Sequence, residues 1–335
     1  VTLEQGTGIV HAAPSHGPDD FNLCLKHGIK AIDTIDDSGR YTNNIPSFKG
    51  IHIFKADQLI IDKLKEEQKL LGNGKLTHSY PHSWRSKAPL VHRATQQWFI
   101  SMESHGLRKK ALKAIDETDF YPKKGKARIR SMIELRPDWC ISRQRTWGVP
   151  LPIFVSKKTN EVLKDPEVIE NIAKIYEKEG SDCWFTDDSQ KFLGNKYNKK
   201  DFIKSTDICE VWFDSGSTHS FVLEKRDDLK WPASMYLEGS DQHRGWFHSS
   251  LLESCGTRGR APYESILSHG FVVDGKGFKM SKSTGNIISP EDILKKYGAD
   301  ILRVWVAASD YAEDLRIDLS ILDQHAESYR KIRNT

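Results

Sequence analysis

The sequence has no closely spaced cysteines. Its five cysteines stand singly and include no Cys-x-x-Cys pair: Cys24, Cys140, Cys183, Cys209 and Cys255. Zinc ribbons and disulfide frameworks are built on paired or regularly spaced cysteines, so neither is indicated and no protein-bound metal is expected. Unpaired cysteines are typical of a reducing compartment, and we expect a cytoplasmic protein.

Long apolar runs are also missing. The longest, near residues 304–308, is far shorter than the roughly 20 residues that cross a bilayer, and the N-terminus has no signal-peptide pattern. We therefore expect no membrane partner. The 38% of hydrophobic residues is still enough for real cores. Because the chain starts at Val1 in mid-pattern, we expect an internal piece of something longer.

Acidic residues are scarce between residues 123 and 145, where only Glu134 and Asp138 occur. The basic residues that we single out in this stretch are Lys123, Lys124, Lys126, Arg128, Arg143 and Arg145. Such a cluster suits a phosphate backbone, and a solvated basic face is the alternative. The net charge of +4 is too small to imply nonspecific DNA binding. No DNA partner is expected.

Residues 1–80 are interpreted as part of a small α+β unit. Helices are expected at residues 18–25, where Pro18 suits the first turn, and at 56–70, where apolar residues recur at helical spacing. Short strands are expected near Val10 and at 50–54.

Residues 81–298 are interpreted as an α/β domain. Short apolar segments at 208–213, 235–237 and 266–273 alternate with helical stretches, which favours a parallel sheet. A polar insertion at 157–205 lacks strong periodicity and is expected to be a surface connector.

A helical segment is predicted near the end of the chain. Ser289 suits an N-cap, Pro290 the first helical position and Gly298 the stop. Further helices are expected at 299–308 and from Leu319 onward. Residues 299–335 are interpreted as the entry into a helical domain.

The loop at residues 275–286, Gly-Lys-Gly-Phe-Lys-Met-Ser-Lys-Ser-Thr-Gly-Asn, concentrates ammonium groups and hydroxyls without a carboxylate. Lys279 and Lys282 are three residues apart and could close on one anionic group, while the glycines permit the backbone movement that closure needs. A polyphosphate is the predicted ligand. A solvated turn is the alternative.

A second candidate loop, at residues 236–247, follows a predicted strand and precedes a helix, where open α/β sheets bind ligands. Its carboxylates and amide suit ribose hydroxyls and an ammonium group, although a structural turn is the alternative. Trp212 and Trp246 could either fill a core or form the walls of an apolar slot.

These segments resemble isoleucyl-tRNA synthetases, which are class I aminoacyl-tRNA synthetases. The resemblance covers nearly the whole chain except residues 157–205. It rests on Lys-Met-Ser-Lys-Ser at 279–283, on the loop at 236–247, on Trp-Phe-Asp-Ser-Gly-Ser-Thr-His at 212–219, and on the runs at 80–85, 93–95, 97–99, 136–150 and 329–335.

The resemblance implies ATP-dependent activation of L-isoleucine and its ligation to tRNA(Ile), on a Rossmann-type parallel sheet. Mg²⁺ would arrive with ATP, bridging phosphates. Lys282, helped by Lys279, would stabilise charge on the pyrophosphate leaving group. The implied ATP and adenylate contacts are Glu238, Gly239, Asp241, Gln242, Ser281, Lys282 and Ser283. Trp212 and Trp246 would flank the isoleucine side chain, and the basic stretch would contact the tRNA acceptor end.

The resemblance also gives residues 1–80 a role, as the C-terminal part of an editing domain. An apolar pocket separates isoleucine from valine by only about 1–3 kcal/mol, and isoleucine enzymes are the standard example of this limit. By position His11 and Asp20 match editing residues, with Asp20 holding the free α-amino group. Ala12 and Ser15 depart from the usual Thr and Gly, which affects the local loop geometry.

A metal site at the start of the chain is an alternative interpretation, because the ligand types fit. Its candidate ligands are His11, His16, Asp19 and Asp20.

Two features of the resembled family have no match. The chain has no His-x-Gly-His loop for ATP phosphates, and the threonine-rich half of the editing site is missing. Both are expected upstream, so this piece alone should be inactive in aminoacylation. A deacylase without ATP-dependent activity, a noncatalytic tRNA-binding module, and a valyl or leucyl enzyme remain alternatives. The family suggests a monomer.

Overall fold

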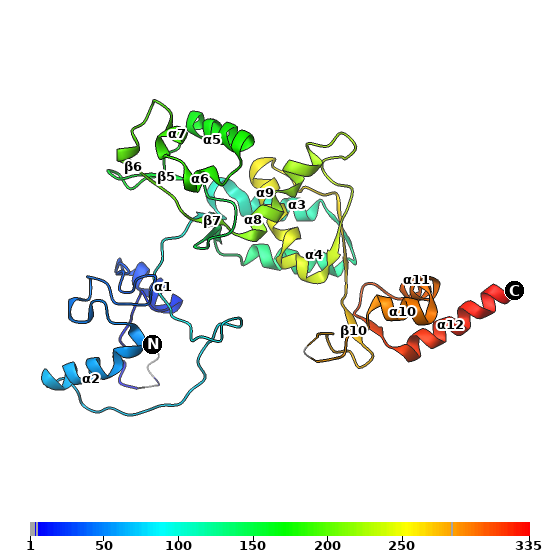
Figure 1. Ribbon diagram of the computed structural model, residues 1–335, viewed down its shortest axis with the longest axis horizontal. Helices are drawn as coiled ribbons and strands as arrows, with labels where there is room; N and C mark the ends of the chain where they lie inside the picture. The colour runs from blue at the N-terminus through cyan, green and yellow to red at the C-terminus, as the bar shows by residue number, and fades with distance from the viewer. Residues whose placement is uncertain (1–3, 5, 283) are drawn as a thin grey trace. The chain divides into compact units, whose positions relative to one another are not determined.

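The computed structural model describes residues 1–335 except 1–3, 5 and 283 (Figure 1). The chain forms two compact units, residues 1–96 and 97–335, whereas composition predicted the first boundary near residue 80. Within the described residues, no helix is both long enough and apolar enough to cross a membrane.

The first unit has two α-helices close to their predicted positions. They are α1 (Pro18–Lys26) and α2 (Asp57–Glu66), accompanied by the short turns η1 (Pro46–Phe48) and η2 (Ile53–Lys55). Pro18 starts α1 because its fixed φ suits the first turn, and two aspartates there complement the helix dipole.

The strands predicted in this unit were wrong. Residues 7–13 have no strand, and residues 50–54 run into η2 after a single bridge between Arg40 and His52. His52 accepts a hydrogen bond from the backbone of Phe54 at 3.3 Å and so favours the turn. A few apolar residues do not specify a strand when no neighbouring strand pairs with them.

A three-stranded parallel sheet lies in the second unit. Its order is β2 (Asp119–Tyr121), β9 (Ser265–His269), β8 (Tyr236–Gly239). The helices that pack around it are α3 (Leu107–Asp116), α4 (Lys124–Glu134), α8 (Val211–Gly216) and α9 (Trp246–Thr257) (Figure 1). Ile266 is fully buried at the centre of the core they share, beside Phe247 and Leu251. The alternation of strands and helices confirms the predicted α/β fold.

Two of the predicted strand segments differ from the structure. Residues 208–213 give only β7 (Ile208–Cys209), after which α8 begins at Val211, so Trp212 lies on a helix. Periodicity cannot separate a strand from a helix in so short an apolar run. Residues 266–273 divide at Gly270 into β9 and β10 (Val272–Asp274), because the chain passes the Glu313 carbonyl there.

Residues 157–205 fold around a hydrophobic core of their own, which the interpretation as a polar surface connector missed. Helix α5 (Pro166–Glu179) buries Val168 and Ile172, four residues apart, against Trp184. The other elements here are α6 (Cys183–Thr186), α7 (Ser189–Leu193), η4 (Lys199–Asp201) and the antiparallel pair β5 (Phe154–Ser156) and β6 (Phe202–Lys204).

The C-terminal helices confirm their predicted boundaries. They are α10 (Pro290–Tyr297), α11 (Ala299–Ala308) and α12 (Leu319–Asn334), beside the parallel pair β10 and β11 (Leu315–Ile317). Ser289 caps α10 by accepting a hydrogen bond from the backbone of Asp292 at 3.2 Å, and Gly298 ends it with φ 79°. Ile293, Trp305 and Leu322 form their shared core, and Met280 of the lysine loop packs against it.

Shorter elements complete the second unit. They are β1 (Phe99–Ile100), η3 (Ser104–Gly106), β3 (Trp139–Cys140), β4 (Ser142–Arg143), the π-turn η5 (His219–Leu223) and η6 (Ser240–Arg244).

Candidate functional site

The carboxyl ends of the parallel strands bring the second candidate loop to one edge of the sheet. Gly239 ends β8 opposite His269, which ends β9, and η6 then leads into α9. Ligands bind at this edge in open α/β sheets because the loops there point away from the strands. The predicted contacts Glu238, Asp241 and Gln242 therefore lie within one turn of chain at the expected end of the sheet.

This loop is held by its own amide and by two close approaches. The Gln242 side chain accepts a hydrogen bond from the Trp246 backbone at 3.0 Å and donates one to Asp241 at 3.2 Å. A Cβ at Gly239 would lie 2.7 Å from Asp241 Oδ1, and one at Gly245 would lie 2.4 Å from Gln242 Oε1. The Asp241 and Gln242 side chains therefore pack closely over the two glycines, and Asp241 stays exposed.

Trp212, one of the two predicted pocket tryptophans, packs against Gly245, the residue before the other, Trp246. Trp212 is 39% exposed, and its Cη2 would lie 2.9 Å from a Cβ at Gly245. Trp246 stacks on Tyr236, with ring centroids 4.0 Å apart and an interplanar angle of 4°, and it donates to the Ser215 carbonyl at 3.0 Å. The structure therefore fixes Trp246 on the core and places an exposed Trp212 ring against the preceding residue, Gly245.

The lysine loop is closed at its base by two residues that sequence reasoning missed. Asp274 accepts hydrogen bonds from the backbone of Phe278 at 2.8 Å and from the Asn286 side chain at 2.8 Å. Asn286 also accepts from the Ser281 backbone at 2.9 Å. The Asn286 and Phe278 hydrogen bonds lower the pKa of Asp274. An aspartate just before a glycine-rich turn, with an asparagine closing it, was the available signal.

The cations of this loop remain available to a ligand. Lys279 and Lys282 are both exposed, and neither ammonium group has a partner within the described part of the chain. The Ser281 hydroxyl lies 2.8 Å from that of Thr284. Ser283, also predicted to bind ATP, lies outside the described residues.

In the predicted basic stretch, some side chains form hydrogen bonds or ion pairs and others have no partner among the described residues. Arg143 donates to the Ser142 carbonyl at 2.7 Å and lies 3.4 Å from the buried carboxylate of Glu210. Two further cations are paired: Lys124 with Glu313 at 2.6 Å, and Lys126 with the Asp116 carbonyl at 2.9 Å. The cations that have no partner among the described residues are Lys123, Arg128 and Arg145. These three are exposed as well as unpaired, whereas Lys124 is exposed but paired.

Three carboxyl groups, those of Glu210, Asp214 and Glu253, interact where α8 meets α9. Asp214 belongs to the run at 212–219, but the sequence analysis assigned none of the three a role. Glu210 is 5% exposed and accepts a hydrogen bond from Trp139 Nε1 at 2.9 Å. Glu253 Oε1 is buried without a partner among the described residues. Burial, with the neighbouring Asp214 and Glu210 charges, raises the pKa of Glu253 to about 9, and burial also raises the pKa of Asp214. Glu253 is therefore neutral near pH 7.

The first unit positions only part of the predicted editing pair. Asp20 accepts a hydrogen bond from the Ala13 backbone at 2.8 Å, whereas His11 is exposed. The described residues contain no group of three His, Cys, Asp or Glu side chains able to hold an ion, so the metal alternative gains no support from them. Both ring nitrogens of His16 are occupied, by His92 and Thr34.

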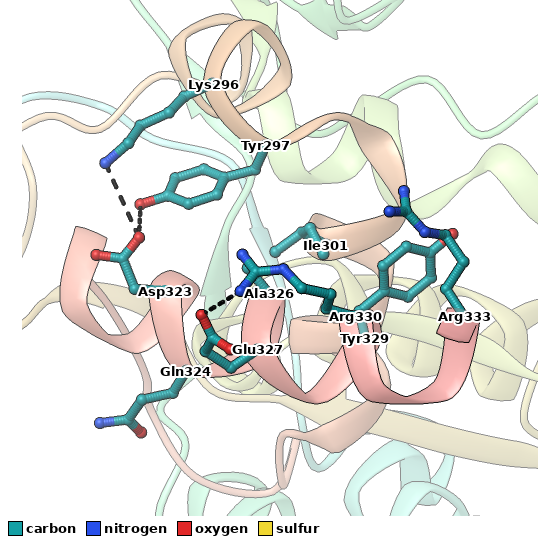
Figure 2. Close-up of a pocket in the computed structure, with 10 residues that line it drawn as sticks. All are labelled: Lys296, Tyr297, Ile301, Asp323, Gln324, Ala326, Glu327, Tyr329, Arg330 and Arg333. Carbon is teal, nitrogen blue, oxygen red and sulfur yellow. Dashed lines mark hydrogen bonds and ion pairs between the residues drawn. The ribbon is translucent and has the colours of Figure 1, made fainter. Parts of the chain in front are cut away.

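A cavity of about 580 Å³ lies among α10, α11 and α12 (Figure 2). Figure 2 shows Lys296 and Tyr297 pointing at Asp323, to which Tyr297 donates a hydrogen bond at 2.7 Å, while Arg330 pairs with Glu327 at 2.6 Å. Its carboxylates are thus already paired, and none of the predicted site residues lines it.

The sequence and fold were compared with those of known proteins. The family model for class I tRNA synthetases (I, L, M and V) matches residues 29–318. Isoleucine–tRNA ligase of Pelagibacter ubique is 79% identical over 335 residues, and that of Syntrophotalea carbinolica is 52% identical over 340. All of this chain is covered in both, but the chain spans only 37% of either relative's length.

Two solved structures have a weaker likeness. Methionyl-tRNA synthetase of Mycobacterium tuberculosis, in complex with methionyl-adenylate, has a TM-score of 0.49 and 18% identity over 76% of this chain and 42% of that one. An Agrobacterium radiobacter LeuRS–tRNA–LeuAMS complex has a TM-score of 0.41 and 18% identity over 59% of this chain and 28% of that one. Neither structural likeness is strong enough to assign a role to any residue of this chain. The family match alone covers most of the chain, which therefore belongs to the class I tRNA synthetases of the isoleucine, leucine, methionine and valine group.

Proposed function

We propose that the protein containing this chain activates L-isoleucine with ATP and transfers it to tRNA(Ile) in the cytoplasm, as a monomer. The observation that carries this proposal is the exposed Trp212 ring packed against Gly245, which precedes Trp246 and belongs to the same loop as the exposed Asp241 carboxylate. Flat apolar walls next to polar groups at a sheet edge suit a branched aliphatic amino acid joined to a nucleotide. Two relatives named isoleucine–tRNA ligase support the choice of substrate.

In this proposal each loop has a distinct task. Glu238, Asp241 and Gln242, with Gly239 allowing close approach, hold the adenylate. Lys282, assisted by Lys279, neutralises charge that develops on the phosphates as pyrophosphate leaves. Mg²⁺ enters with ATP as part of the substrate. The loop hydroxyls of Ser281 and Ser283 line the same phosphates.

The remaining domain assignments are part of the same proposal. Residues 1–80 contribute the C-terminal part of an editing domain, in which Asp20 holds the α-amino group of a mischarged residue and His11 lies nearby. Residues 81–298 form the second half of the catalytic domain, and 299–335 lead into the anticodon-binding helices. The tRNA acceptor end is contacted through the unengaged cations Lys123, Arg128 and Arg145.

The test is amino-acid-dependent ATP–pyrophosphate exchange by the full natural protein, with isoleucine, valine and leucine compared in parallel. Exchange should be strongest with isoleucine. If valine or leucine is preferred, the protein is a valyl or leucyl enzyme instead of an isoleucyl one. Absence of exchange with all three would refute synthetase activity and favour a deacylase or a tRNA-binding module.

Lys282→Ala provides the sharper test of the phosphate assignment. Removing a preorganised charge from a phosphoryl-transfer site should lower kcat for exchange by about 10²–10³-fold. Lys276→Ala is the matched control, because Lys276 is an exposed lysine of the same loop with no assigned role. Equal rates for the Lys282→Ala variant and the wild type would exclude Lys282 as a phosphate ligand.

A further inference from the structure

A second cavity lies where the parallel sheet meets the strands that carry the lysine loop. Its volume is about 440 Å³, and its walls come from five places in the sequence: α4, the start of η6, the β9–β10 turn with β10, the lysine loop, and the segment around β11. Ser240 and Gly277, which line it, belong to the two loops assigned above to the nucleotide. The cavity is therefore next to the proposed site without containing its assigned catalytic lysines.

Three cations line this cavity, and two of them are uncompensated. Arg128 and Arg316 have exposed guanidinium groups without a partner among the described residues. The Arg316 guanidinium is 3.6 Å from the position of a Cβ on Gly277 and so lies beside the lysine loop. An arginine fork recognises phosphate oxygens in pairs, which makes two unpaired guanidinium groups in one cavity a phosphate-type environment.

The third cation, Lys124, is neutralised by an anion of the protein itself. Its ammonium lies 2.6 Å from Glu313 Oε1, and the two side chains are 62% and 71% exposed. Exposed pairs of this kind contribute little to stability, so an incoming anion can replace the carboxylate. The other carboxylate of the cavity, Asp314, is occupied by the Phe271 backbone at 2.8 Å.

We propose that this cavity binds one phosphate group through Arg128, Arg316 and Lys124, with Glu313 as the internal competitor that the phosphate displaces. Two sources could supply that group, free pyrophosphate and a backbone phosphate of tRNA. Both belong to the aminoacylation reaction, so the inference rests on the proposed function and deepens it. Since binding is measured without catalysis, its failure is distinguishable from a failure of exchange activity.

The experiment measures Kd for inorganic pyrophosphate by calorimetry and for a tRNA(Ile) transcript by filter binding, using the full natural protein. Arg128→Gln and Arg316→Gln should each weaken binding of one ligand by about tenfold, because each removes a charged hydrogen bond. Glu313→Gln should tighten binding of the same ligand. Lys109→Gln, an exposed lysine of α3 outside the cavity, is the charge-matched control and should bind as wild type.

The two ligand sources give different results. A backbone phosphate predicts weaker tRNA binding and a salt-dependence slope lower by about 1 for each arginine removed, with pyrophosphate affinity unchanged. If free pyrophosphate is the ligand, the arginine variants should bind pyrophosphate more weakly, with tRNA affinity and its salt dependence unchanged. Arg316→Lys keeps the positive charge but loses the guanidinium fork, so its ligand affinity should lie between those of wild type and Arg316→Gln. It also tests the proposal if Arg316→Gln misfolds. Arginine variants indistinguishable from Lys109→Gln for both ligands, or a Glu313→Gln variant that weakens binding, would overturn the proposal.

Discussion

At the scale of single residues, burial decides the charge of the Glu253 and His219 side chains. Glu253 carries a carboxyl oxygen without a partner among the described residues, and its pKa is raised from 4.5 to about 9. His219 is 1% exposed, and burial lowers its pKa. Both side chains are neutral near pH 7, because a charge without a partner costs more in the interior than the proton gain or loss that removes it.

Glu253 should make the stability of the second unit depend on pH. Its folded pKa lies above its unfolded value, so its contribution to stability is complete below about pH 4.5 and is lost as pH rises toward 9. Glu253→Gln has no proton to lose. We expect this variant to be more stable than wild type by roughly 1–3 kcal/mol at pH 8, with the difference vanishing near pH 4.

Urea unfolding of the two proteins between pH 4 and 9, followed by tryptophan fluorescence, measures the difference. Glu161→Gln, at an exposed carboxylate in the same unit, is the control and should run parallel to wild type. A Glu253→Gln difference that stays constant with pH would show that Glu253 is ionised in the folded protein.

At the scale of elements, the seam between α8 and α9 sets the position of Trp212. Gly216 ends α8 against α9, and a Cβ there would lie 2.2 Å from Glu253 Oε1 and 3.0 Å from the backbone carbon of Ser249. The backbone contact cannot be relieved by a rotamer change. The seam is therefore closed to any side chain at Gly216.

Gly216→Ala should consequently push α8 away from α9. We expect a loss of about 1–3 kcal/mol in unfolding free energy from overpacking, and a several-fold rise in KM for isoleucine because Trp212 moves with its helix. Unfolding and pyrophosphate exchange measure the two effects.

Gly256→Ala is the matched control for this change. Gly256 is a glycine of α9 whose added Cβ would meet only Leu107 Cδ1, at 3.8 Å. It should be neutral or stabilising by about 0.5 kcal/mol, since alanine favours a helix more than glycine does. Equal KM values for wild type and Gly216→Ala would show that the contact between α8 and α9 does not influence the amino-acid site.

At the scale of the whole molecule, the chain consists of two compact units that differ in how much they bury. Residues 71–80 of the first unit are all exposed and have no helix or strand, and Leu76 is 84% exposed. Residues 157–205, although polar, fold around Trp184 and Phe192, which are fully buried. Local opening should therefore be easier in the first segment than in the second.

Limited trypsin digestion of the full natural protein tests this difference. The first cut within this chain should follow Lys75, in the exposed segment, because a protease needs an extended and accessible backbone. Mass spectrometry of the early fragments identifies the position. Cleavage after Lys174 in α5 before cleavage after Lys75 would contradict the folded state of residues 157–205.

Features that depend on short stretches of chain could be predicted before the fold was known. The Ser289 cap, the Gly298 stop and the β8 loop could be predicted because caps, turns and strand ends depend on neighbouring residues. The family could be identified for the same reason, since its motifs are contiguous. Strand positions near Val10 and at 50–54 could not, because a strand requires a partner elsewhere in the chain.

Which side chains share an environment depends on how distant parts of the chain pack together. The Glu210, Asp214 and Glu253 cluster, the Asp274–Asn286 closure of the lysine loop, and the cavity of Arg128 and Arg316 each join residues far apart in sequence or outside any motif. The same holds for Arg143. The sequence grouped it with accessible cations, but in the folded chain it lies beside Glu210. Charge state and accessibility depend on packing, and packing is a property of the folded chain.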